Sequence, residues 1–126
     1  MSAVFEHNLR AVLNVPGVTA IAGDRIYPLL APPDVARPYV VWQRIASEPQ
    51  VSLAGFTSGL ERIRVQIDCY ADTPDAVFAL AAAVRAAVQA ATGPVRGITV
   101  NETDFFEDDT RLYRRAVDVS VFHRSA

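Results

Sequence analysis

The sequence contains no lysine, only one cysteine and no long apolar run. All twelve of its basic residues are therefore arginine. A single cysteine cannot form an internal disulfide, and the apolar runs are too short for a signal peptide or a membrane span. These absences predict a protein that does not enter membranes and is made and kept in the cytoplasm.

The sequence also lacks a basic stripe. The formal net charge is −2, and acidic and basic residues are spread along the whole chain, so no segment is built to neutralise phosphates. We therefore expect no specific nucleic-acid binding. The use of arginine alone has two compatible explanations, a coding bias or a preference for the planar guanidinium at protein interfaces.

No familiar catalytic or metal-binding pattern is present. Cys69 shares the apolar side of its segment, which predicts a buried, protonated thiol. His7 and His123 have no local partner that would make a catalytic base, so we expect them at the surface or partly buried. The acidic cluster of Glu102, Asp104 and residues 107–109 lacks the glycine and closing glutamate of a calcium loop and indicates a solvated turn. We predict no enzyme activity, no cofactor and no metal.

The length and composition fit a single domain over residues 1–126. With 51% hydrophobic residues in 126, a chain of this size buries about two thirds of the surface that its unfolded form exposes. Residues 2–14 have helical apolar spacing behind Ser2, a possible cap. Prolines and glycines then predict an irregular connector up to residue 37, with at most a short strand at 25–27.

Strands and a second helix follow. Residues 38–46 are β-branched and aromatic, residues 47–59 indicate a long loop, and residues 60–70 alternate between apolar and polar. Thr73 and Pro74 mark the start of a long helix that ends near Gly93. Residues 95–106 and 112–123 predict a hairpin. The expected fold is α+β, a mainly antiparallel four-stranded sheet of two hairpins with two amphipathic helices on one face.

The alternating segment at residues 60–70 poses a question of function. Ile63, Val65, Ile67 and Cys69 alternate with a polar set, which consists of Arg62, Arg64, Gln66 and Asp68. The apolar side is suited to the core. The polar side is either a wet surface or a surface that contacts another chain.

Residues 24–88 resemble the small tail-completion proteins of long-tailed bacteriophages and gene transfer agents. This family includes tail terminators and tail-to-head joining proteins. The segments that carry the resemblance are Arg25–Tyr27, Pro38–Gln43, Asp68–Ala71, Tyr113–Arg114 and Val117–Val121. With those near the C-terminus, the resemblance covers nearly the whole chain.

The resemblance implies a structural virion protein. Such proteins form a ring, usually a hexamer, at the head-proximal end of the tail tube, where the ring stops tube growth and joins the tail to the head connector. The implied partners are copies of itself, the tail tube protein and the connector, with DNA only in passage. Alternatives are a small ligand-binding or catalytic domain, which would need Cys69 near a histidine, and a monomeric adaptor.

Three candidate surfaces follow from the ring interpretation. The polar set Arg62, Arg64, Gln66 and Asp68 would pair subunits. The loop from Glu48 to Ser58 would order against a neighbour or the tube through Val51, Leu53 and Phe56, since a free loop gains nothing from exposed apolar side chains. The acidic turn of Glu107, Asp108 and Asp109 would border the DNA channel or face outward.

Overall fold

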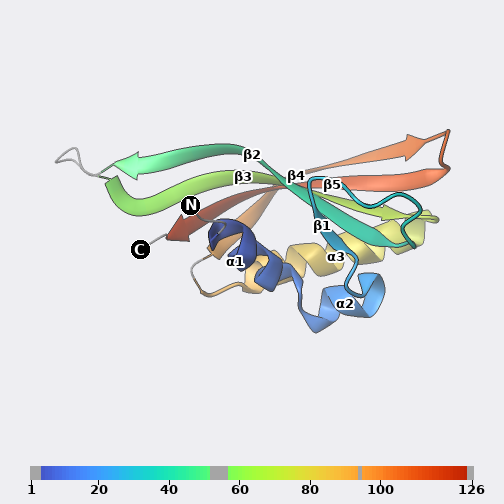
Figure 1. The fold of residues 1–126 in the computed structure, drawn as a ribbon, viewed down its shortest axis with the longest axis horizontal. Helices are drawn as coiled ribbons and strands as arrows, with labels where there is room; N and C mark the ends of the chain where they lie inside the picture. Colours follow the sequence, from blue (N-terminus) through green and yellow to red (C-terminus); the bar gives the residue numbers. More distant parts are fainter. Residues whose placement is uncertain (1–3, 52–56, 94, 125–126) are drawn as a thin grey trace.

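Three helices cover one face of a twisted five-stranded sheet (Figure 1). The computed structural model describes residues 4–51, 57–93 and 95–124. The helices are α1 (Val4–Leu13), α2 (Pro16–Ala22) and α3 (Pro74–Ala90). None of these described helices is both long and apolar enough to cross a membrane. The α+β class and the helix layer on one face are as predicted.

The sheet has one more strand than the sequence predicted. Its order is β1-β2-β3-β5-β4, and the strands are β1 (Ile26–Pro28), β2 (Tyr39–Val51), β3 (Thr57–Ala71), β4 (Val95–Glu107) and β5 (Leu112–Arg124). β1 lies parallel to β2, and the other neighbours are antiparallel. The expected count of four strands left out β1, although the sequence allows a short strand at residues 25–27, close to where β1 lies. Because β1 has three residues and ends at a proline, it carries almost no periodicity of its own.

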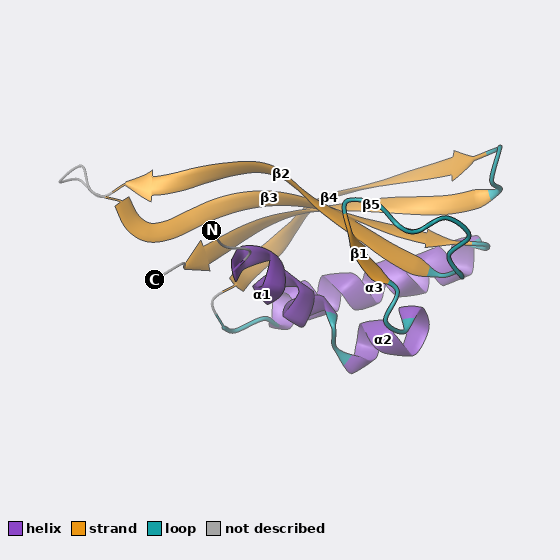
Figure 2. Cartoon of the chain, in the orientation of Figure 1, coloured by secondary structure: helices purple, strands orange, loops and turns teal. Residues whose placement is uncertain are grey.

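The two hairpins point to opposite ends of the molecule. Figure 2 shows β2 and β3 extending past the helices on the left, while β4 and β5 meet at the right-hand end. The β4–β5 hairpin turns at residues 108–111, where the sequence predicted it. The helices therefore leave the left-hand ends of β2 and β3 uncovered.

The core lies between the helices and the sheet. Ile63, Val65 and Ile67 of β3 are fully buried, as are Val117 and Val119 of β5. They meet Leu80, Ala81, Val84 and Val88 of α3, together with α1 and α2. The alternation of β3 and β5 thus predicted the buried side correctly.

Helix α3 begins and ends near the predicted signals. The Thr73 side chain accepts a hydrogen bond from the Ala76 N–H at 3.2 Å, and Pro74 follows in the first turn. This satisfies one of the donors that a helix start leaves unpaired. The helix then places its valines and alanines against the sheet.

The connector after α1 contains a helix that the sequence analysis missed. Pro16 and Gly23 do not prevent a regular element here but bound α2: Pro16 occupies its first turn, and Gly23 ends it with a left-handed φ of 61°. Proline is well suited to a helix start, and glycine to a helix end. Val18 and Ala22 bring this short helix into the core.

The predicted loop at residues 47–59 is largely strand. β2 continues to Val51 and β3 begins at Thr57, with Ser47 paired to Ile63 and Val51 paired to Thr57. Pro49 does not end the strand. It fits because β2 has no strand on its other side at this point in the described part of the chain, and a proline is tolerated on such an edge.

Candidate assembly surfaces

The polar set predicted on β3 lies on the face of the sheet turned away from the helices, here called the outer face. Arg62, Arg64, Gln66 and Asp68 alternate with the buried apolar residues of β3. Their neighbours on β5 include Asp118, which lies opposite Gln66. The structure therefore brings all four together on one surface.

Arg64, Gln66 and Asp68 have polar partners within the chain. The Arg64 guanidinium donates to Asp118 at 3.2 and 2.5 Å, and this hydrogen bond raises the pKa of Arg64. Asp68 accepts from Gln66 at 3.1 Å and from Arg114 at 3.2 Å. The set is thus part of a network that crosses from β3 to β5.

Asp68 is the least exposed of the set. It retains 7% of its surface, because it lies under the loop that follows β1, near Val41 and Tyr70. A buried carboxylate needs compensating donors, and Arg114 and Gln66 supply them. The Asp68 side chain is therefore largely shielded from water, and its bond to Arg114 links β3 to β5 at this end of the sheet.

The acidic turn lies at the end of the β4–β5 hairpin. Glu107 is the last residue of β4, and Asp108 and Asp109 follow in the turn, all three exposed. Arg111 adopts a left-handed φ of 59° and places its guanidinium 5.4 Å from the centre of the Phe106 ring. The turn thus presents its carboxylates at one end of the molecule.

The predicted loop anchors fall mostly outside the described residues. Leu53 and Phe56 lie in the undescribed segment 52–56, and Val51 is known only as the last residue of β2. Their role stays a prediction.

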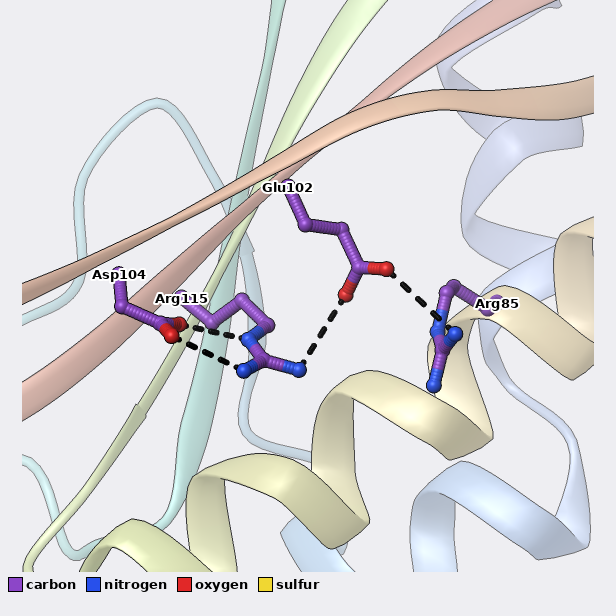
Figure 3. Close-up of polar contacts among 4 residues, drawn as sticks. All are labelled: Arg85, Glu102, Asp104 and Arg115. Carbon is purple, nitrogen blue, oxygen red and sulfur yellow. Dashed lines mark hydrogen bonds and ion pairs between the residues drawn. The ribbon is translucent and has the colours of Figure 1, made fainter.

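A charged cluster between α3 and the sheet was not recognised from the sequence. Figure 3 shows Arg115 of β5 between two carboxylates of β4: it donates to Asp104 at 2.6 and 3.0 Å and contacts Glu102 at 3.5 Å. Glu102 also pairs with Arg85 of α3 at 3.4 Å. The hydrogen bonds from Arg115 lower the pKa of Asp104. Two arginines against two carboxylates leave no net formal charge, and the cluster ties α3 to the sheet.

This cluster corrects the interpretation of the acidic residues. Glu102 and Asp104 are not part of a solvated turn but lie two residues apart on β4, on the side that faces the helices. Their spacing of two was the available signal, since it puts them on one face of a strand. Arg85 and Arg115 could not be paired with them without the register of the sheet.

The cysteine and the histidines make no catalytic arrangement. Cys69 is fully buried, and burial raises the pKa of its thiol. His7 is exposed, whereas His123 is buried, contrary to the expectation of a surface or partly buried residue. The His123 ring packs edge-on against Phe5 and lies 3.1 Å from the Asn8 side chain. Within the described ranges, no three His, Cys, Asp or Glu residues are placed to hold a metal ion.

Two hollows lie on opposite sides of the sheet. One, of about 540 Å³, runs between α1 and the end of α3, and alanines and valines line most of it. The other, of about 370 Å³, lies between the loop after β1 and the outer face, beside Tyr39 and Tyr70. The described residues that line these two hollows include no serine, cysteine or histidine, the side chains that most often supply a nucleophile and its base.

Comparison with known protein families identifies the family of this chain. A model of the tail completion protein gp17 family matches residues 8–124. The chain belongs to this family. The resemblance found in the sequence is therefore confirmed, and this tail completion protein is a structural tail component, not an enzyme.

A solved structure shows the same fold. A chain from the "Virion of native gene transfer agent (GTA) particle" superposes on this tail completion protein with a TM-score of 0.68. The match covers 97% of this chain and 98% of that chain at 18% sequence identity, so the likeness concerns the fold. Comparison of the sequence with curated proteins gives no match.

Proposed function

We propose that this tail completion protein forms a ring of six copies at the head-proximal end of the tail tube. There it stops tube growth and joins the tail to the head connector. The observation that carries the proposal is the family match over residues 8–124. The likeness in fold to a chain of a gene transfer agent virion supports it.

The shape of the subunit also suits a ring. A ring of identical copies needs two different surfaces on each copy, because every contact is heterologous and closes by rotation. The two edges of this sheet differ, since a short parallel strand lies at one and a 13-residue antiparallel strand at the other. A subunit with two unlike edges fits this requirement.

The proposed partners are further copies of this chain, the tail tube protein and the head connector. DNA passes through the ring without specific binding, which agrees with the formal net charge of −2, since cationic contacts are what hold phosphates. The protein acts in the virion after assembly in the host cytoplasm.

Two further contacts are proposed from the sequence. The polar set on β3 pairs copies, which requires Arg64 and Asp68 to share their present partners Asp118 and Arg114 with a neighbour. Val51, Leu53 and Phe56 anchor the ring to a neighbour or to the tube. For these anchors, Phe56→Ala should reduce incorporation into tails, and unchanged incorporation would refute the role.

Particle assembly without the protein tests the proposal. Tails should grow past their normal length and stay detached from heads in electron micrographs, and supplying the parent protein should restore joined particles of normal length. A mass measurement of the protein bound to tail ends should give six copies. Joined tails of normal length without the protein, or a single copy per tail, would contradict the proposal.

A further inference from the structure

The sheet has two edges without a neighbouring strand. β4 is the last strand in the order, and in the part of the chain that the structure describes nothing pairs with its outer side. At the other side, β1 pairs only with Val40, Val41 and Trp42 of β2. The outer side of β2 is therefore unpaired from Gln43 onward among the described residues. Such edges are templates for pairing with another strand.

Exposed apolar side chains gather along these two edges. Ile98, Val100, Phe105 and Phe106 are exposed on β4, with Ile98 at 65%. On the other edge, Leu29, Leu30 and Ile45 are exposed, with Leu30 at 82%. Folded proteins usually protect edge strands with charges or prolines. Exposed apolar residues near both edges indicate surfaces that another chain covers.

The backbone of the loop after β1 is fixed in a conformation that leaves Leu29 and Leu30 exposed. Leu29 has a left-handed φ of 68°, which is unfavourable for a bulky residue. Its N–H donates to the Trp42 carbonyl at 2.8 Å, so the backbone is fixed at the edge of β2. Strain of this kind persists where the surroundings hold it and often marks a binding site.

The two edges also match in their irregularities. β2 has a bulge at Ile45, between the pairs Arg44–Val65 and Ala46–Arg64. β4 has one at Val100, between the pairs Thr99–Val119 and Asn101–Asp118. Since Val65 pairs with Val119, both bulges lie next to the same row of the sheet. Each places an exposed apolar residue beside this row, Ile45 on one side of it and Val100 on the other, within about one residue of the same height on opposite edges.

The strand directions fit a continuous sheet. β2 runs antiparallel to β3, β3 to β5, and β5 to β4, so β4 runs opposite to β2. When a second copy continues the sheet in the same orientation, its β2 lies beside β4 and antiparallel to it. Antiparallel pairing is the more stable arrangement per residue.

We infer that copies of this chain join edge to edge, β4 of one copy pairing with the free edge of β2 of the next. Val100 then lies beside Ile45 of the partner subunit. The partner is a second copy because both halves of the joint are present on one chain, with bulges next to the same row, opposite strand directions and exposed apolar residues at both. The inference rests on the proposed ring and names its subunit joint.

Disulfide trapping between two singly substituted proteins tests the joint. Ile45→Cys and Val100→Cys proteins are mixed, assembled on tail ends and mildly oxidised. The control pair is Ile45→Cys with Phe122→Cys, because Phe122 is also exposed but lies on β5, which has a strand on each side. The native Cys69 is fully buried and does not compete.

We expect roughly tenfold more disulfide-linked dimer from Ile45→Cys with Val100→Cys than from the control pair, since a disulfide needs Cβ atoms about 4 Å apart. Alternate amides of β4 should also become protected from hydrogen exchange on assembly. Linking of Val100→Cys protein to itself would indicate a two-fold joint and overturn the inference. Equal yields from both pairs, or a ring without linkage, would also overturn it while leaving the ring standing. Absence of any ring on tails would instead refute the proposed function.

Discussion

Arg64 and Asp118 form an ion pair on the outer face. Variants of this pair can distinguish the two roles of the outer face, contact within the subunit and contact with a neighbour. The pair joins β3 to β5 within one subunit, and the same charges are candidates for contact with a neighbour. A single charge reversal would disturb both roles at once. An exchange of the two charges keeps the internal pair and reverses the pattern that a neighbour meets.

We therefore predict different outcomes for single and double variants. Arg64→Glu should lower the stability of the subunit and weaken the ring, because it places two carboxylates side by side. Adding Asp118→Arg should restore subunit stability but not the ring. Sedimentation and denaturant unfolding measure the two effects. A double variant with the parent oligomer distribution would show that this face does not contact a neighbour.

Tyr70 provides a prediction about alkaline pH. It stacks on Tyr39 with ring centres 4.7 Å apart, and burial, followed by the nearby Asp68 carboxylate, raises the pKa of Tyr70 to about 12. The fold thus favours the neutral phenol, so its contribution to stability is complete below the ordinary tyrosine pKa and is lost as pH rises towards 12. Tyr70→Phe should remove this late step from a phenolate absorbance titration. Loss of an ordinary step near pH 10, with the late step retained, would instead place Tyr70 in water.

At the scale of elements, the sequence predicted the features that depend on residues close together in the chain, namely strand alternation and helix capping. The inward residues of β3 and β5 and the start of α3 at Thr73 follow from spacing and from one hydrogen-bonding side chain. The full length of β2 did not, because its last residues are held by pairing with β3 rather than by their own propensity. The charge cluster around Arg115 depends in the same way on the register between β4 and β5.

Truncation of Ile67 tests the predicted core. Its side chain is fully buried between the sheet and the helices, so Ile67→Ala should lower the free energy of unfolding by about 2–5 kcal/mol. Ile98→Ala, on the exposed side of β4, is the control and should change the isolated subunit little. Denaturant melts measure both. A loss below about 0.5 kcal/mol for Ile67→Ala would contradict its placement.

Gly97 allows β4 to lie close to its neighbours. A Cβ atom there would lie 3.1 Å from the Ser120 carbonyl oxygen and 3.2 Å from Val88 of α3. Gly97→Ala should therefore destabilise the protein by about 1–3 kcal/mol, since a backbone oxygen cannot easily move aside. Gly93→Ala is the matched control because nothing lies within 4 Å of its added Cβ. Equal stability of the two variants in thermal unfolding would show that the strand adjusts freely.

At the scale of the whole molecule, the acidic turn provides a test of orientation. If Asp108 and Asp109 border the DNA channel, changing both to arginine should slow DNA passage, because cationic side chains bind phosphates. Asp24→Arg, an equally exposed acid near α2, is the control and should leave passage unchanged. Ejection kinetics measure the effect. Normal kinetics in the Asp108 and Asp109 variant would place the turn on the outside of the ring.

Because the two hairpins point in opposite directions, a ring of these subunits has two different faces. Copies related by rotation about one axis carry the β4–β5 turn at the same height, so all the carboxylates of Glu107, Asp108 and Asp109 gather on a single circle. The other hairpin, with the two chain ends, lies at the opposite end of each subunit (Figure 1). Such a ring has polarity, because one rim carries this circle of carboxylates and the other carries the β2–β3 hairpins. Turning the ring over would exchange the surfaces that it presents to its two neighbours. A ring that joins two unlike partners therefore distinguishes them by the rim that each one contacts.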